Sequence, residues 1–400
     1  MSDVRATGPA AGEDAAQPAT AGDTAAPVPG QDAGESAAVT NSRRTARGFA
    51  HRSRVVTGTV LRSGAGGLSV RVRGRALAVT AAIAVALVAV MLVSLTTGDY
   101  PLSVGEVLRA LAGKDSGGAD FIVNTLRMPR LLTAIAVGAA LAVSGAVLTS
   151  LTGNALGSPD VIGFTNGSAV GALTVIIVLH GSMTQIALGA LAGGLATAAA
   201  VYLLLLGRGL QGFRLVVIGI GVSSLLLAVN SYLITRATWQ EALEAQAWLI
   251  GSLSNRGWTH ANAILVAVAV LLPPALFLSR RLSMVEMGDI TAMALGVNVA
   301  RTRALLLLIS VALAAFATAV TGPIWFVALA APQLARRLTR TAGPALLPAA
   351  LMGALLLTVS DLAAQRLFAP SLLPVGTATG TIGGFYLIWL LITESRKSRA

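Results

Sequence analysis

Residues 131–148 read LLTAIAVGAALAVSGAVL, an apolar run of helical length that follows two arginines in RMPR, residues 127–130. A bilayer core of about 30 Å needs about 20 helical residues for one crossing, so this run predicts a membrane span. Hydrophobic residues make up 55% of the chain and charged residues only 12%, with a mean hydropathy of +0.76. Soluble domains carry about 25% charged residues, so the composition indicates a membrane protein.

Further apolar runs recur between charged or turn-rich breaks and predict an all-α, polytopic fold of about ten transmembrane helices. The predicted spans are 76–95, 131–150, 161–180, 184–206, 215–235, 261–279, 304–321, 323–335, 346–366 and 375–393. The block 304–335 is too long for one span and short for two. Because Pro323 and Pro332 each remove a backbone donor and break the helical ladder, we expect a bend around Thr321-Gly322-Pro323. Stretches such as GAALAVSGA, residues 138–146, and LGALAGGLATAAA, residues 188–200, predict close helix approach through small residues.

Positive charge is divided unevenly between the two sides of this topology. With an internal N-terminus, 22 of the 29 lysines and arginines fall on the inner side and seven on the outer side. The bias follows the positive-inside rule, so both termini are predicted to be cytoplasmic in a multi-pass protein of the cell membrane. It also accounts for the net charge of +12 without a nucleic-acid partner.

Three regions follow from these patterns. The first 48 residues almost lack large apolar side chains and cannot offset the entropy of ordering, so a disordered basic cytoplasmic tail is predicted over 1–75. A transmembrane region follows over 76–393, and a short cytoplasmic tail over 394–400. Nine arginines and no acidic residue lie between Arg43 and Arg75, a composition that favours contact with anionic membrane lipids.

The sequence contains few candidate residues for a metal site, a cofactor site or ion coupling. The chain has no cysteine and three scattered histidines, so neither a metal site nor another cofactor is expected. It also lacks the GxxxxGK[ST] phosphate loop, and energy for any transport is expected from a separate subunit. Asp160 and Asp361 are the acidic candidates for an ion-coupled transporter, although each could instead cap a helix or lie among lipid headgroups.

The longest inner loop, residues 279–304, reads SRRLSMVEMGDITAMALGVNVARTRA. Its apolar residues recur three and four apart, which predicts an amphipathic helix. Those residues are Met284, Met287, Ile290, Met293 and Leu295. Such a helix lies on a membrane surface or inserts its apolar face into a groove on a partner.

Six ordered segments resemble one known family. They are RMPR with GAALAVSGA, GNALGSPDVIGFTNGSAVGA (153–172), WLIGSL (248–253), GDITAMALGV (288–297), GPIWFVALAAPQLAR (322–336) and SDLAAQRLFAPSLLPVGTATGTIGGFYLIWLL (360–391). Together they resemble the FecCD permeases, the membrane subunits of ABC importers for ferric siderophores, haem and cobalamin. The resemblance covers about 76–393.

The resemblance implies four partners and a mechanism. Two permeases, copies or relatives of each other, would form a dimer around a central path, with two ABC ATPase subunits below and an extracytoplasmic substrate-binding protein above. The coupling loop, residues 279–304, would enter the ATPase cleft. Its implied contact residues are Gly288, Asp289, Ala292, Leu295 and Gly296.

Other positions carry implied roles at the two ends and in the path. Arg127 and Arg130 would dock the binding protein, with plain interfacial anchoring as the alternative. A third family arginine follows Asp361 by four positions, where this chain has Gln365 followed by Arg366. The implied inner gate is Asn154, Leu156, Gly212 and Phe213. The implied path-lining residues are Ser223, Ser224, Asn230 and Ser231, which could equally serve interhelical hydrogen bonds.

This chain departs from the family pattern near the gate. The usual NPLA reads NALG, an upstream glutamine is Thr149, and the usual Pro-His pair is Pro332-Gln333. The function predicted overall is a non-enzymatic permease subunit of an ATP-driven importer for ferric siderophores. The alternatives are a cobalamin or haem permease, or an ion-coupled secondary transporter that uses Asp160 or Asp361.

Overall fold

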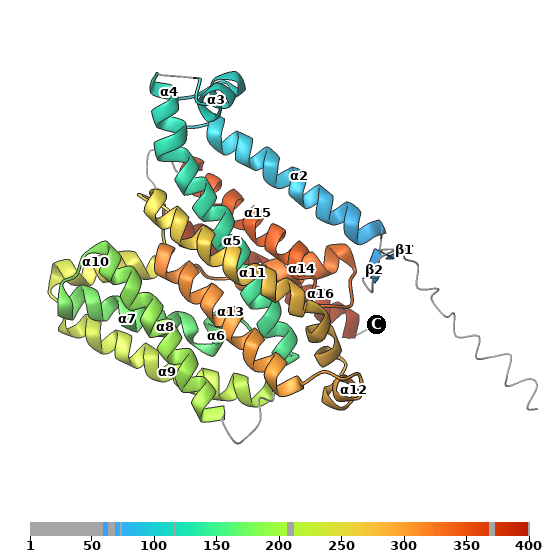
Figure 1. Ribbon diagram of the computed structural model, residues 1–400. Helices are drawn as coiled ribbons and strands as arrows, with labels where there is room; N and C mark the ends of the chain where they lie inside the picture. Colours follow the sequence, from blue (N-terminus) through green and yellow to red (C-terminus); the bar gives the residue numbers. More distant parts are fainter. Residues whose placement is uncertain are drawn as a thin grey trace, which may run out of the picture. The chain divides into compact units, whose positions relative to one another are not determined.

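The computed structural model describes residues 59–62, 69–72, 74–114, 117–205, 212–367 and 373–398 (Figure 1). Two strands precede the helices, β1 (Thr59–Arg62) and β2 (Ser69–Val72), and they pair antiparallel. The first half of the helical region contains α2 (Gly74–Thr96), α3 (Val104–Leu111), α4 (Gly118–Asp120), the π-helix η1 (Phe121–Arg127), α5 (Met128–Thr152), α6 (Pro159–Ile162), α7 (Phe164–Leu173), the π-helix η2 (Thr174–Leu179) and α8 (Met183–Leu205). The second half contains α9 (Gly212–Arg236), α10 (Trp239–Ile250), α11 (Trp258–Glu286), α12 (Asp289–Ala294), α13 (Val299–Thr321), α14 (Val327–Thr339), α15 (Leu346–Arg366) and α16 (Val375–Ser398).

Every predicted span corresponds to a helix, which confirms the all-α, polytopic fold. Within the described residues, seven helices are long and apolar enough to cross a membrane: α2, the run from α4 through α5, α8, α9, α11, α13 and α15. The remaining three predicted spans correspond to α7 with η2, to the 13-residue α14 and to the 24-residue α16.

The predicted terminal tails lie partly outside the described residues. Residues 1–58 fall outside, and the tail boundary at 75 stays a prediction. The β1–β2 hairpin lies inside the range predicted to be disordered, and local pairing of two four-residue strands gave no clear signal in an arginine-rich segment. At the other end, α16 continues to Ser398, beyond the predicted boundary at 393.

The centre of the bundle is α5, which is buried along almost its whole length. It packs against α11, α13, α14 and α15 (Figure 1). A Cβ added to Gly138 would collide with the carbonyl of Gly353 on α15, and one added to Gly145 would collide with the carbonyl of Ala328 on α14. These backbones therefore approach as closely as glycine allows, which confirms the packing predicted from GAALAVSGA.

Helices α7 and α8 also approach each other closely through glycine residues. Added Cβ atoms at Gly171 and Gly193 would meet the carbonyls of Gly189 and Gly167 on the facing helix. In lipid, where apolar burial gives helices little reason to associate, such contacts supply the van der Waals energy of packing. Gly189 and Gly193 of the stretch 188–200 therefore lie at a helix interface, whereas Ala196, Ala199 and Ala200 of the same stretch are exposed.

The expected bend between α13 and α14 is confirmed. Helix α13 ends at Thr321, Gly322 has φ 75°, and α14 begins at Val327. The freed carbonyl of Thr321 accepts from the amide of Ser252 at 2.8 Å. The irregular backbone is thus packed against protein, as irregular backbone at membrane depth must be. The expectation for Pro332 was wrong, because α14 continues through it.

Candidate functional site

The loop between α11 and α13 forms a short helix that projects at one end of the bundle (Figure 1). Gly288 and Gly296, on either side of α12, have φ 104° and 80°, a region that disfavours side chains with a Cβ. Asp289 accepts two hydrogen bonds from the Arg303 guanidinium, at 3.0 and 2.8 Å. Ala292 is buried beneath the helix. The loop therefore has a defined shape, held at both ends.

The outer face of this loop is apolar. Met287, Ile290, Met293 and Leu295 are all exposed, with Ile290 83% exposed. Beneath them a small core contains Val285, Ala292, Val297 and Val299, with Met284 packed against it. Four of the five apolar residues that predicted an amphipathic helix therefore point outward, and Met284 points inward. The predicted extent was too long, because α11 continues to Glu286 and α13 begins at Val299.

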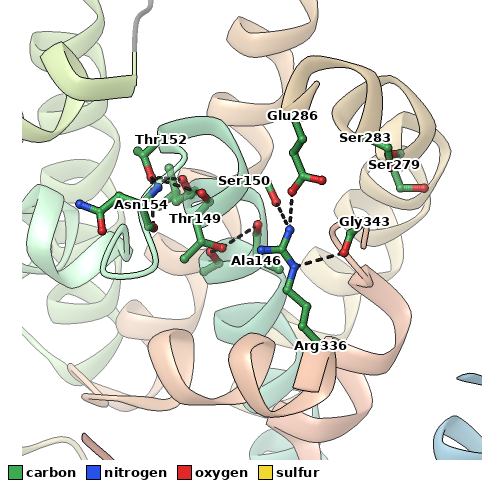
Figure 2. A network of polar contacts seen from close by, with 12 residues as sticks. Ala146, Thr149, Ser150, Thr152, Asn154, Ser279, Ser283, Glu286, Arg336 and Gly343 are labelled. Carbon is green, nitrogen blue, oxygen red and sulfur yellow. Dashed lines mark hydrogen bonds and ion pairs between the residues drawn. The ribbon is translucent and has the colours of Figure 1, made fainter. Parts of the chain in front are cut away.

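Arg336 of α14 joins the base of this loop to the end of α5 (Figure 2). Its Nη2 forms an ion pair with Glu286, the last residue of α11, and donates to Ser150 Oγ at 3.3 Å. Its Nε donates to the carbonyl of Gly343 at 3.1 Å. One guanidinium thus contacts α11, α5 and the segment after α14. The sequence reasoning missed Arg336, although it closes the quoted segment GPIWFVALAAPQLAR.

The predicted gate residues lie around the segment that follows α5. Gly153 ends α5 in the left-handed conformation, and Asn154 Oδ1 then accepts from the amide of Leu156 at 2.9 Å. Across from it, a Cβ on Gly212 would lie only 2.5 Å from the carbonyl of Thr152. The start of α9 therefore packs directly against the end of α5. Leu156 and Phe213 are both exposed at this end.

Gln333 connects the gate segment to two further helices. Its Nε2 donates to the carbonyl of Ala155 at 2.7 Å, and its Oε1 accepts from the hydroxyl of Tyr386 on α16 at 3.2 Å. Ala155 and Gln333 are two of the positions where this chain departs from the family pattern. The two departures are in contact, a pairing that sequence spacing alone could not show.

At the opposite end of α5, Arg130 forms an ion pair with a buried carboxylate. Its Nε and Nη2 donate to the two carboxylate oxygens of Asp361 at 3.0 and 2.7 Å. The Asp361 side chain is 6% exposed and also accepts from Gln365 Nε2 at 2.8 Å. Asp361 is therefore neither a helix cap nor a headgroup ligand. Arg130 bonds α5 to α15 through its Nε and Nη2, and its side chain is also part of the lining of a pocket at this end.

Arg127, Arg130 and Arg366 all line a pocket of about 250 Å³ at this same end. Arg127 donates to the carbonyls of Leu95 and Tyr100, so it also fixes the turn after α2. Arg366 lies 3.9 Å from the exposed carboxylate of Asp99. Of the three predicted docking arginines, Arg366 therefore has the weakest intramolecular partner.

The four predicted path residues divide between two faces of α9. Ser223 accepts from Asn166 Nδ2 at 2.8 Å, and Asn230 donates to the Asn166 carbonyl at 3.4 Å, so this pair faces α7. Ser224 and Ser231 are exposed and donate only to carbonyls of α9 itself. Seven residues separate the members of each pair, two helical turns, so each pair shares a face.

Asp160, the other acidic candidate, lies in the short helix α6. It is buried and accepts from Thr165 Oγ1 at 2.7 Å, which explains how the carboxyl is accommodated. Among the described residues, no group of three or more histidine, aspartate or glutamate side chains could hold a metal ion.

These arrangements define a class: a polytopic α-helical membrane protein with a projecting apolar loop at one end and an arginine pocket at the other. Its sequence matches the FecCD transport family over residues 86–393. The chain belongs to this family of multi-pass membrane permeases.

Individual relatives agree with the family. The chain is 46% identical over 303 residues to the ferric enterobactin transport system permease protein FepG of Escherichia coli, covering 76% of this chain and 92% of the relative. It is 38% identical over 310 residues to the achromobactin transport system permease protein CbrC of Dickeya dadantii, covering 76% and 88%. A solved inward-facing metal-chelate type ABC transporter matches with a TM-score of 0.71 and 30% identity, covering 80% of this chain and 99% of that one.

Proposed function

We propose that this chain is the permease subunit of an ATP-driven importer for ferric siderophores. The observation that carries the proposal is the loop from Met287 to Leu295, whose exposed apolar face needs a partner. Relatives named for ferric enterobactin, achromobactin and Fe(3+) dicitrate support iron chelates as the substrate class. The chain itself performs no covalent step, and ATP hydrolysis belongs to a separate subunit.

The partner for this loop is an ABC ATPase. An apolar helix of six residues with a glycine at each end suits insertion into a cleft as a rigid unit. Arg303 holds the helix through Asp289, so a force on α12 is transmitted to the start of α13. Two ATPase subunits would each receive the loop of one permease, with a second permease completing the dimer.

Movement of the loop has a short route to the gate. Glu286 lies two residues before Gly288 and is bonded to Arg336, which is bonded in turn to Ser150. Ser150 is four residues before Asn154, the first predicted gate residue. A tilt of the end of α11 would therefore change the position of the gate segment, with Gln333 holding that segment to α14.

The outer pocket is the proposed docking site for an extracytoplasmic binding protein. Exposed charge pairs contribute about 0–1 kcal/mol each, which suits a partner that lands in one orientation and leaves in every cycle. Arg366 and the exposed part of Arg127 serve this contact. Arg130 also lines this pocket, and its ion pair with Asp361 fixes α5 to α15.

The second permease would face the exposed side of α9. Val217, Ile220 and Ser224 lie on this side and Ser231 follows two turns later. Ser224 and Ser231 are the two predicted path residues that remain open for weak contacts with a passing chelate. Weak contacts suit a path because a cargo that binds tightly is not released.

Reconstitution into liposomes tests the proposal. With its ATPase and binding protein, the permease should accumulate a ferric siderophore only when ATP is hydrolysed, and cobalamin and haem should be poor substrates. Uptake driven by a proton or sodium gradient in the absence of the ATPase would instead favour the ion-coupled alternative. In that case Asp160→Asn, which removes the one acidic candidate without an arginine partner, should abolish it.

A further inference from the structure

A groove of about 580 Å³ lies between α8 and α13, away from the clusters described above. Its walls are almost entirely apolar and include Leu195, Ala198, Ala199, Leu305, Leu308 and Val311. Two polar side chains also line it, Tyr202 and Arg301. Tyr202 lies in the last turn of α8 and Arg301 in the first turn of α13, so both mark the end of the groove near α12.

The Arg301 guanidinium does not contribute to the polar contacts that hold the described helices together. Among the described residues its side chain has no hydrogen-bond or ion-pair partner, whereas Arg303, two residues further, is held by Asp289. The mouth of the groove therefore carries a planar cation suited to bidentate contact with a phosphate.

The form of the groove limits what can occupy it. Leu195, Leu305 and Leu308 are exposed, so the groove is open along the side of the bundle. By the arginine bias, its charged end faces the cytoplasm and its apolar length lies in the inner half of the membrane. The matching ligand has an anionic head and a long apolar body, and basic pockets between helices on the cytoplasmic side bind anionic lipid head groups.

We propose that this groove binds an anionic phospholipid of the inner leaflet. One acyl chain lies along Leu195, Leu308 and Val311, and the phosphate lies on Arg301 beside Tyr202. An aromatic ring at the membrane interface is typical of such a position. Since Arg301 lies in the first turn of α13, the headgroup would lie at the base of that helix, within the predicted coupling loop of residues 279–304. Lipid binding itself does not depend on the proposed transport function.

Native mass spectrometry of the purified permease tests the site, with phosphatidylglycerol and phosphatidylcholine added in turn. The wild type should retain phosphatidylglycerol in preference. Arg301→Ala should reduce that retention by about fivefold, the value expected for one interfacial charge, and Arg301→Lys should keep part of it. The matched control is Arg281→Ala, which removes an exposed arginine at the same end but outside the groove. It should change nothing.

A second variant tests the acyl-chain part of the site. Ala199 lines the groove and is exposed, so Ala199→Phe should fill it and lower the retention of both lipids while the thermal unfolding midpoint stays unchanged. Equal retention of the two lipids in wild type and Arg301→Ala would overturn the proposal. A change from dimer to monomer in Ala199→Phe, without lipid loss, would also overturn it by showing that the groove is a protein interface.

Discussion

At the scale of single residues, three outward arginines that look alike in the sequence have different tasks. Arg130 is bonded to a buried carboxylate, Arg127 to two backbone carbonyls, and Arg366 lies 3.9 Å from an exposed carboxylate. Removing one partner of a buried ion pair leaves the other charge uncompensated. The consequence of substitution should therefore differ sharply among the three.

We predict that Arg130→Ala destabilises the protein by about 3–5 kcal/mol, because Asp361 is left buried without its partner. The double variant Arg130→Met with Asp361→Leu should recover most of the loss, since both charges are removed together. Chemical unfolding in detergent measures both. Arg366→Ala should leave stability within about 0.5 kcal/mol and weaken binding-protein docking. Equal destabilisation by Arg130→Ala and Arg366→Ala would contradict the view that Arg130 stabilises the fold and Arg366 serves docking.

At the scale of elements, α12 is a short helix with an apolar outer face. The glycines on either side of it, Gly288 and Gly296, have positive φ angles, which are strained for a residue with a Cβ. Burial of a side chain such as Ile290 against a partner is worth about 1.5–3 kcal/mol. A charged side chain at that position would lose its water on binding the partner, which costs free energy and weakens the complex. The helix should therefore be sensitive to polarity on this face even though the permease does not need it for folding.

We expect Ile290→Asp to reduce co-purification of the ATPase by at least about tenfold. Membrane insertion and unfolding temperature should be unchanged because Ile290 is almost fully exposed. Thr291→Asp, one position further on an exposed site of the same helix, adds the same charge without removing the apolar side chain and is the control. If both variants lose the ATPase equally, charge rather than apolar contact decides the interaction.

Arg336 provides a second test at this scale, of the link between loop and gate. Arg336→Lys keeps the charge but cannot reach Glu286, Ser150 and Gly343 together, because a lysine lacks the planar fork. Hydrogen bonds to charged groups are worth about 1.5–3 kcal/mol, so uptake should fall by about tenfold or more while ATP hydrolysis continues. The ratio of chelate transported to ATP hydrolysed is the measurement. Arg340→Lys, at the exposed residue that directly follows α14, should keep the ratio of the wild type.

At the scale of the whole molecule, the bundle depends on backbones that touch through glycine. Gly138 and Gly353 face each other between α5 and α15, and Arg130 bonds to Asp361 further along the same pair of helices. Close packing and a buried ion pair thus hold the central helix in one register against α15. The outer pocket and the gate segment lie at the two ends of α5, so this register relates one to the other.

Gly138→Leu should destabilise the bundle by about 1–3 kcal/mol or more, since overpacking displaces backbone that cannot move aside. Its match is Gly384→Leu in α16, where an added Cβ would meet nothing within 4 Å. Unfolding midpoints of the two variants in one detergent make the comparison. A tolerated Gly138→Leu would show that α5 and α15 separate more easily than their contact implies.

Much of the fold could be predicted because membrane solvation acts on composition. A run of about 20 apolar residues must be helical in lipid to satisfy its own backbone, so span positions follow from the sequence directly. The break after Thr321 could also be predicted, because Pro323 lacks the backbone N–H that a continuing helix would need. Helix ends were less predictable, since α11 and α13 extend into the loop where the apolar signal fades.

The amino-acid sequence by itself determined the membrane class, the position of the ten apolar runs and the uneven distribution of positive charge, because each depends on local composition. Only the tertiary structure decided which polar side chains meet. The pairs Arg130–Asp361 and Arg336–Glu286 join residues 231 and 50 positions apart, and Gln333 contacts the gate segment 178 positions away. Such contacts depend on how the helices are arranged around α5, which no periodicity in the chain records.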